Sequence, residues 1–300
     1  MKYLSFSCFL VILFLVGCSK DEISLNTLED SFLLIENINA LAFDQDLEEL
    51  LLDAFAVDDS STKTVDNASK GFTEDKFKSR YGSCVTITHD EDKNQKTIFF
   101  GDDCNRLSKQ SRTGSIVISY SEEKDLLGSF RQTDFVDFSM NGIKIEGVRL
   151  TEITAIDPNG NKTRQSTLEN GKMIYEDGTF STKQKSFTYY TVVEDKKRQY
   201  TTLTGSSTGV STKGQNFSMN ITKPIKYSHT CFSDKWFSKK WKIPVDGVKN
   251  IVKGSETIVI DFGDGSCDLT ATVTSNGVSK IIDLFKMKRG KKFKKPKKID

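Results

Sequence analysis

Histidine is scarce in this sequence: His89 and His229 are the only two among 300 residues. No Cys-x-x-Cys pair occurs, and neither histidine stands at a ligand spacing from a cysteine, which argues against a structural zinc site. A serine hydrolase would have to recruit one of these two isolated histidines. We therefore expect no cofactor and favour a non-enzymatic role.

Long apolar runs are equally scarce, and the one that exists opens the chain. It extends from about Leu4 to Gly17, which is shorter than the ~20 residues of a membrane-spanning helix. Lys2, the apolar core and the small final residue predict a signal peptide over residues 1–17. An ordinary secretory signal cut elsewhere would fit the same run. However, Leu15-Val-Gly-Cys18 resembles the bacterial lipobox, which predicts Cys18 as a lipid-modified N-terminus attached to a membrane.

The residues after Cys18 predict a destination. Ser19 stands where inner-membrane retention signals place Asp, so we expect the outer membrane. Lys20, Asp21 and Glu22 resemble the lysine followed by two acids that marks surface export of lipoproteins in Bacteroidota. The same three residues also suit the start of a solvated linker. The sequence predicts a lipid-anchored protein of the outer membrane, exposed at the cell surface.

Charge is distributed unevenly. The formal net charge is +2, but residues 286–300 hold nine Lys or Arg and a single acid, so the rest of the chain is acidic. A basic tail can bind polyanions. Nucleic acid is not expected as a partner outside the inner membrane, whereas an anionic glycan or an envelope protein is within reach. A solvated tail without a partner explains the same composition.

Cysteine usage fits an oxidising compartment. Cys8 leaves with the signal peptide and Cys18 takes lipid, which leaves Cys84, Cys104, Cys231 and Cys267. An even number of cysteines outside the cytoplasm favours disulfides. Four cysteines allow three pairings, and the most local one joins the first two and the last two.

Hydrophobic periodicity predicts a mainly β protein. Residues 28–57 repeat leucines at helical spacing, which predicts an amphipathic helix within a tether over residues 18–70. From Gly82 the period becomes two, and turn signals punctuate the strands: Asp92-Lys-Asn94, Asn141-Gly142, Pro158-Asn-Gly160, Asn170-Gly171, Asp177-Gly178 and Asn276-Gly277. Such turns join antiparallel neighbours. We expect a hairpin meander over residues 71–285, as a β-sandwich or a curled sheet, with a division into 71–222 and 223–285 left open.

Two similar turns stand near the ends of the predicted β domain. Phe100-Gly-Asp-Asp-Cys104 and Phe262-Gly-Asp-Gly-Ser-Cys267 each follow an apolar strand. Together with Met140 to Gly147 and Pro244-Val-x-Gly247, they resemble a family of uncharacterised outer-membrane lipoproteins from Bacteroidota, over roughly residues 75–285. The resemblance implies a cell-envelope β protein and transfers no functional residue.

Two groups of residues are candidates for ligand binding. Asp261, Asp264 and Asp268 offer oxygens of the kind that Ca²⁺ prefers, although a tight turn explains the same residues. Trp236, Phe237 and Trp241 alternate with lysines, a pattern suited to stacking on sugars or holding anions. They suit a local core equally, because Trp is mostly buried in folded proteins.

Catalytic patterns are weaker. Gly205-Ser-Ser-Thr-Gly209 matches the GxSxG of a nucleophile elbow, but its surroundings are typical of strand followed by strand rather than strand followed by helix. Glycoside hydrolysis requires a pair of carboxylates in one cleft, and the sequence does not select such a pair. The prediction is a lipid-anchored envelope protein with a binding or accessory role, and the alternative is a hydrolase of envelope or dietary glycans.

Overall fold

The computed structural model describes residues 73–101, 111–195, 197–231 and 243–284, together with part of a helical segment between Asp44 and Val57. The described residues of that segment are Asp44, Leu47, Glu48, Leu50, Leu51, Asp53, Ala54, Phe55 and Val57. Predictions for the signal peptide, Cys18, Lys20, Asp21, Glu22, Cys104, the aromatic residues 236, 237 and 241, and the basic tail fall outside the described residues.

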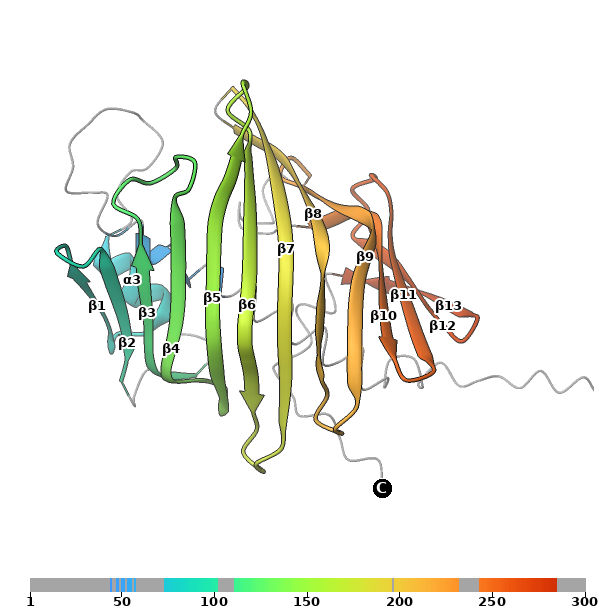
Figure 1. The fold of residues 1–300 in the computed structure, drawn as a ribbon, viewed down its shortest axis with the longest axis horizontal. Coiled ribbons are helices and arrows are strands. Elements are labelled where there is room, and N and C mark those ends of the chain that lie inside the picture. The colour runs from blue at the N-terminus through green and yellow to red at the C-terminus, as the bar shows by residue number, and fades with distance from the viewer. Residues whose placement is uncertain are drawn as a thin grey trace, which may run out of the picture.

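One antiparallel sheet of thirteen strands makes up most of the described chain (Figure 1). Every strand pairs with its neighbour in sequence, and the two edges do not close on each other. The strands are β1 (Val85–Asp90), β2 (Gln95–Phe100), β3 (Arg112–Tyr120), β4 (Phe130–Met140), β5 (Ile143–Ile156), β6 (Lys162–Ile174), β7 (Phe180–Glu194), β8 (Lys197–Val210), β9 (Asn216–Ser228), β10 (Ile243–Lys253), β11 (Glu256–Asp264), β12 (Thr270–Ser275) and β13 (Val278–Asp283).

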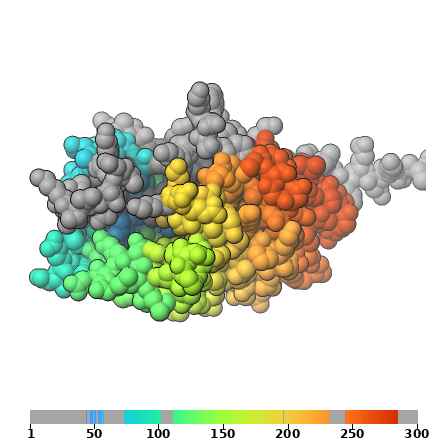
Figure 2. Space-filling model, turned by 90° about the horizontal axis from the view of Figure 1, so that it is seen from above, coloured from blue at the N-terminus to red at the C-terminus, as the bar shows by residue number. Residues whose placement is uncertain are grey.

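The predicted hairpin meander is therefore confirmed, as a single curled sheet. Figure 2 shows its curvature from above, with the helical residues on the concave side. Residue 222 lies within β9, and the sheet continues through it without interruption.

Most of the predicted turns occupy hairpin positions. Asn141 and Gly142, between β4 and β5, both have positive φ, as do Asn276 and Gly277 between β12 and β13. The turn predicted at Asn170-Gly171 is wrong, because both residues lie inside β6. The register against β7 shifts there, so an extra residue forms a bulge and the strand continues.

Bulges of this kind recur across the sheet and account for its curvature. The register shifts at Gly114 in β3, Gly147 in β5, Gly205 in β8 and Gly247 in β10. Gly205 has φ +122°, and a Cβ there would overlap the carbonyl oxygen of Ser186 in β7. Only glycine tolerates this conformation and this close approach. Bulges bend a strand and increase its twist, so the wide sheet curls instead of lying flat.

The concave side carries two clusters of buried apolar residues. The first packs strands β1 to β5 under Leu50, Leu51 and Phe77, and the second packs strands β7 to β13 around Ile251 and Ile258. Phe77 belongs to α3 (Glu74–Tyr81), whose N-cap is Thr73. The two phenylalanines of the repeated turns, Phe100 and Phe262, are buried in the first and second cluster respectively.

The helical segment is fixed by polar contacts as well as by its leucines. The hydroxyl of Tyr81 in α3 donates to Oδ2 of Asp53 at 2.7 Å, and Arg80 pairs with the same carboxylate. Lys96 of β2 donates to the carbonyl oxygen of Ala54 at 3.3 Å. Among the described residues, no helix has the length and apolar character needed to cross a bilayer.

Candidate functional site

A row of paired residues crosses the concave face at the middle of the sheet. Arg149 of β5 stands opposite Leu168 of β6, which stands opposite Lys185 of β7, and Lys185 stands opposite Ser207 of β8. Side chains alternate between the two faces of a strand, so the members of this row point to one side. All but Leu168 are buried. The sheet thereby places two long cationic side chains beneath the helical segment.

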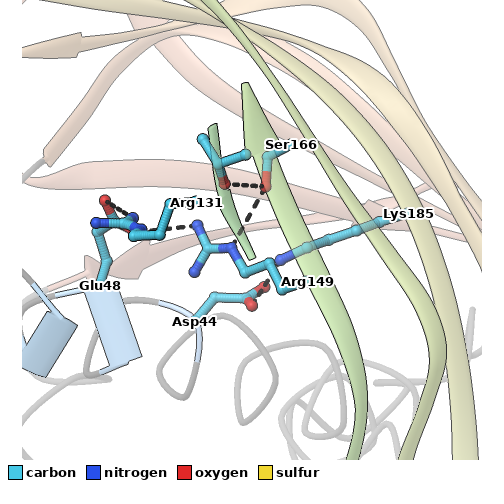
Figure 3. Close-up of polar contacts among 7 residues, drawn as sticks. Asp44, Glu48, Arg131, Arg149, Ser166 and Lys185 are labelled. Carbon is cyan, nitrogen blue, oxygen red and sulfur yellow. Dashed lines mark hydrogen bonds and ion pairs between the residues drawn. The ribbon is translucent and has the colours of Figure 1, made fainter. Parts of the chain in front are cut away.

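Two carboxylates of the helical segment reach these cations (Figure 3). Nζ of Lys185 donates to Oδ1 of Asp44 at 2.6 Å. Nη2 of Arg149 donates to Oε2 of Glu48 at 2.9 Å, and Nη2 of Arg131 in β4 reaches both oxygens of Glu48 at 3.2 Å. Asp44 and Glu48 are four positions apart, so they lie on one face of a helix. The segment thus contributes its acids and its leucines to the same concave surface.

Positive charge exceeds negative charge inside the concavity. Four cations gather at the row, Arg131, Arg149, Lys183 and Lys185, beside two acids, Asp44 and Glu48. Asp44 and Glu48 keep 23% and 25% of their side chains exposed. Buried charges are costly unless paired, so an excess of one sign in this position requires an explanation.

The pKa values of the interior groups reflect this excess. Burial raises the pKa of Asp44, but Lys185, Lys183 and Arg149 outweigh that effect and hold it below the ordinary value. Burial lowers the pKa of Lys185 to about 8, and the charges of Arg149 and Lys183 act in the same direction against the opposing pull of Asp44. The neighbouring cations therefore account for the low pKa of Asp44, whereas burial is the main cause for Lys185 and the cations add to it.

Lys249 is another buried cation of the described chain. It lies on β10, two residues from the fully buried Ile251 and therefore on the same face. Burial, followed by the charge of Lys183, lowers the pKa of Lys249 to about 8. Its ammonium lies 5.7 Å from the ring centroid of Phe262. Within the described part of the chain, no carboxylate pairs with it.

Two further polar atoms of the row have unused bonding capacity. Nη1 of Arg149 and Oγ of Ser207 are buried and have no hydrogen-bond partner. Buried polar groups are nearly always hydrogen-bonded, and leaving one unpaired costs about 1–3 kcal/mol. Both residues belong to the row that holds Lys185. Two unpaired atoms therefore lie in the row that also holds Lys185.

A cavity of about 60 Å³ adjoins this charged row. Its apolar lining includes Leu47, Phe135, Ile145, Leu168, Met173 and Phe217. Arg149, Lys183 and Asp44 also border it. Glu146 and Lys172 line it as well, so a mostly apolar wall carries five charged side chains.

The three predicted aspartates make local hydrogen bonds to the backbone. Oδ1 of Asp261 accepts a hydrogen bond from the backbone of Gly263 at 2.9 Å. Asp264 accepts from Ser266, and Asp268 accepts from the backbone of Thr270 at 3.0 Å. Each carboxylate therefore accepts from the backbone N–H two positions ahead, Asp261 within strand β11 and the other two at its end or beyond it. Within the described ranges, no three His, Cys, Asp or Glu side chains gather closely enough to hold a metal ion.

The predicted cysteines give one complete pair. Cys231 and Cys267 form a disulfide, with their Cα atoms 5.6 Å apart, as the most local pairing predicts. Cys84 is disulfide-bonded as well, and its predicted partner, Cys104, lies outside the described residues. The aromatic candidates Trp236, Phe237 and Trp241 lie outside them too, as do Cys18, Lys20, Asp21 and Glu22.

The GxSxG pattern forms no nucleophile elbow. Its central serine, Ser207, lies in the middle of strand β8 and is 2% exposed. A nucleophile elbow requires a turn from strand to helix and a neighbouring base. Gly205 instead forms a bulge, and Gly209 lies beneath the ring of Phe217. The small residues of this pattern therefore serve packing.

Sequence reasoning missed the residues of the charged row. A signal was available in β7, where Lys183 and Lys185 alternate with Gln184 in step with Phe187 and Tyr189. Lysines that share the face of buried aromatic residues point inward. No sequence pattern indicated which acids would pair with these cations, because Asp44 and Glu48 belong to a distant helical segment.

Comparisons with known proteins do not place the chain: no protein-family model, no curated protein and no solved structure matches it.

Proposed function

We propose that the protein is a lipid-anchored binding protein of the cell envelope and that it takes an anionic ligand on the concave face of its sheet. The observation that carries the proposal is the excess of cations at the row, where Arg131, Arg149, Lys183 and Lys185 stand beside two acids, Asp44 and Glu48. Carboxylates, phosphates and sulfates are the chemical groups that such cations bind. An anion at this position would offset the charge that Asp44 and Glu48 leave uncompensated.

The arrangement supports binding better than a purely structural role. A buried structural ion pair is favourable only when its remaining hydrogen-bonding groups are satisfied. Here Arg149 retains an unpaired nitrogen, and Lys183 forms no ion pair within the described chain. Because Lys183 borders the cavity and is only half-buried, a small anion can reach it without unfolding the sheet.

The envelope location rests on the sequence. Leu15-Val-Gly-Cys18 supports lipid attachment, and Lys20, Asp21 and Glu22 support export to the surface. The disulfide between Cys231 and Cys267 is consistent with an oxidising compartment. An anionic glycan or an acidic envelope protein would be available there as the natural source of the anion.

The described residues do not single out a pair of carboxylates for the alternative, a glycan hydrolase. A glycosidase needs one carboxylic acid whose pKa is raised so that it can donate a proton. The pKa shifts of Asp44, Asp125 and Asp246 are all downward, each because of neighbouring lysines. These groups favour the ionised form. No observation on the described residues favours hydrolysis over binding.

Two probes that differ only in charge test the proposal. Benzoate and benzamide have nearly the same shape, and their binding to the purified mature chain carrying Cys18→Ser is measured by calorimetry. Benzoate is expected to bind at least tenfold more tightly. Lys183→Gln should reduce that preference, whereas Lys197→Gln, at an exposed position on β8, should leave it unchanged. Equal binding of the two probes would overturn the proposal.

A further inference from the structure

We infer that the ligand is an anionic amphiphile, with its head group at Arg149 and Lys183 and its apolar tail in the adjoining cavity. The inference rests on the proposed function and adds the class of ligand. A fatty acid and the acyl part of an acidic lipid share this chemistry. The charged row alone would accept any small anion, so the tail must be argued from the cavity.

The wall of the cavity is suited to a hydrocarbon chain. Leu47, Phe135, Ile145, Leu168, Met173 and Phe217 surround it. A polar ligand such as a sugar would leave its hydroxyl groups unpaired against these side chains. A volume of about 60 Å³ has room for about four water-sized groups at roughly 10–15 Å³ each. That space suits the first part of an alkyl chain.

The charged end of the cavity is suited to a carboxylate or phosphate. Arg149 is 6% exposed, and its Nη1 is unpaired. Lys183 borders the same cavity without an ion pair in the described chain. The two acids of the lining are already engaged: Asp44 with Lys185 at 2.6 Å, and Glu146 with Lys144 at 3.5 Å. The remaining charge at this end is therefore positive.

The helical segment indicates how a longer tail is accommodated. Leu47 forms part of the wall and Asp44 part of the charged end, and both come from this segment. The segment thus contacts the concave face through carboxylates and apolar side chains. An anionic amphiphile would contact it through the same two kinds of group. We expect a longer chain to shift Leu47 outward and to take over part of its contact with the sheet.

Three probes test the inference on the mature Cys18→Ser chain by calorimetry: octanoate, octanol and acetate. Octanoate has both features of the ligand, octanol has only the tail and acetate only the charge. Each buried methylene contributes roughly a fourfold gain in affinity. Octanoate is therefore expected to bind at least tenfold more tightly than either of the other probes.

Two variants separate the head from the tail. Met173→Phe fills part of the cavity and should weaken octanoate binding at least fivefold without changing the binding of acetate. Lys183→Gln should weaken octanoate binding about tenfold, and Lys197→Gln should have no effect. Circular dichroism and melting temperature establish that each variant is folded before its binding is compared.

The outcomes are distinguishable. If acetate binds as tightly as octanoate and Met173→Phe changes nothing, the amphiphile inference fails while anion binding stands. If octanol binds as tightly as octanoate, the head group is not recognised and both proposals fail. Absence of binding by octanoate, acetate and benzoate would also overturn both.

Discussion

The ammonium nitrogen of Lys185 lies 2.6 Å from Oδ1 of Asp44, although the two residues are 141 positions apart in the chain. One belongs to the middle of a long strand and the other to a helical segment that precedes the sheet. Their contact joins the concave face to its cover. It also balances one of the buried cations, so its loss should affect both stability and access to the cavity.

Asp44→Asn should destabilise the protein by about 3–5 kcal/mol, because it leaves the ammonium of Lys185 buried without a partner. The free energy of unfolding in urea measures this. Adding Lys185→Met should restore most of the loss, since it removes the unpaired charge. Asp125→Asn is the control: Asp125 pairs with Lys162 but is 70% exposed, so its loss should cost less than about 1 kcal/mol. Equal losses for the two single variants would contradict the account.

Stability should depend on pH through Lys249. Burial lowers its pKa to about 8, below the ordinary 10.5 that applies to the unfolded chain. Between these values the unfolded chain holds a proton that the folded chain has released, so the free energy of unfolding rises with pH. Below pH 8 the cost of burying the ammonium is fully present.

Lys249→Met removes that cost. The variant should be more stable than the parent at pH 7, by up to about 3 kcal/mol, and the difference should shrink as the pH approaches 10. Urea midpoints at several pH values measure the difference, with Lys197→Met as an exposed control. A constant difference between pH 7 and 10 would show that Lys249 does not titrate in this range.

The glycine bulges should be sensitive to a single methyl group. Gly114 has φ +82°, and a Cβ there would overlap the carbonyl group of Asp137 in β4. Gly128 has the same φ, yet nothing lies within 4 Å of its Cβ position. Gly128→Ala should therefore cost only the left-handed conformation, about 1–2 kcal/mol. Gly114→Ala should lower the melting temperature distinctly further, and similar melting temperatures would argue against a steric role.

Breaking the disulfide should loosen the end of the sheet. Cys231 and Cys267 are separated by 36 positions, and a crosslink of this span contributes about 2–4 kcal/mol. Cys231→Ser should lower the melting temperature and expose one new thiol, Cys267, to a thiol reagent. The unmodified mature protein should show no reactive thiol; detection of one would contradict the predicted pairing of all four body cysteines.

Lipid attachment should depend on Cys18 alone. Cells fed a labelled fatty acid should label the protein, and Cys18→Ala should abolish the label. Protease added to intact cells should degrade the protein if Lys20, Asp21 and Glu22 direct it to the surface. Protection from protease, in cells where a known surface protein is cut, would contradict surface exposure but not the anchor.

The sequence by itself determined the class of fold. A period of two from Gly82 onward, interrupted by Asn-Gly and Asp-Gly pairs, is sufficient for a hairpin meander because strand alternation and turn geometry are local properties. The same local reasoning failed at Asn170-Gly171, where the residues of a turn form a bulge. A bulge and a turn use the same positive φ, and only pairing with the neighbouring strands separates them.

Only the tertiary structure decided which side of the sheet is concave and what it holds. The bulges bend the strands, and the helical segment places Asp44 and Glu48 against Lys185 and Arg149. The pattern of β7 indicates that its lysines point inward, but the acids that meet them do not follow from local patterning, because they come from a segment distant in the chain. The candidate site is therefore formed by contacts between distant segments. The sequence shows which residues are available for it but not how they are brought together.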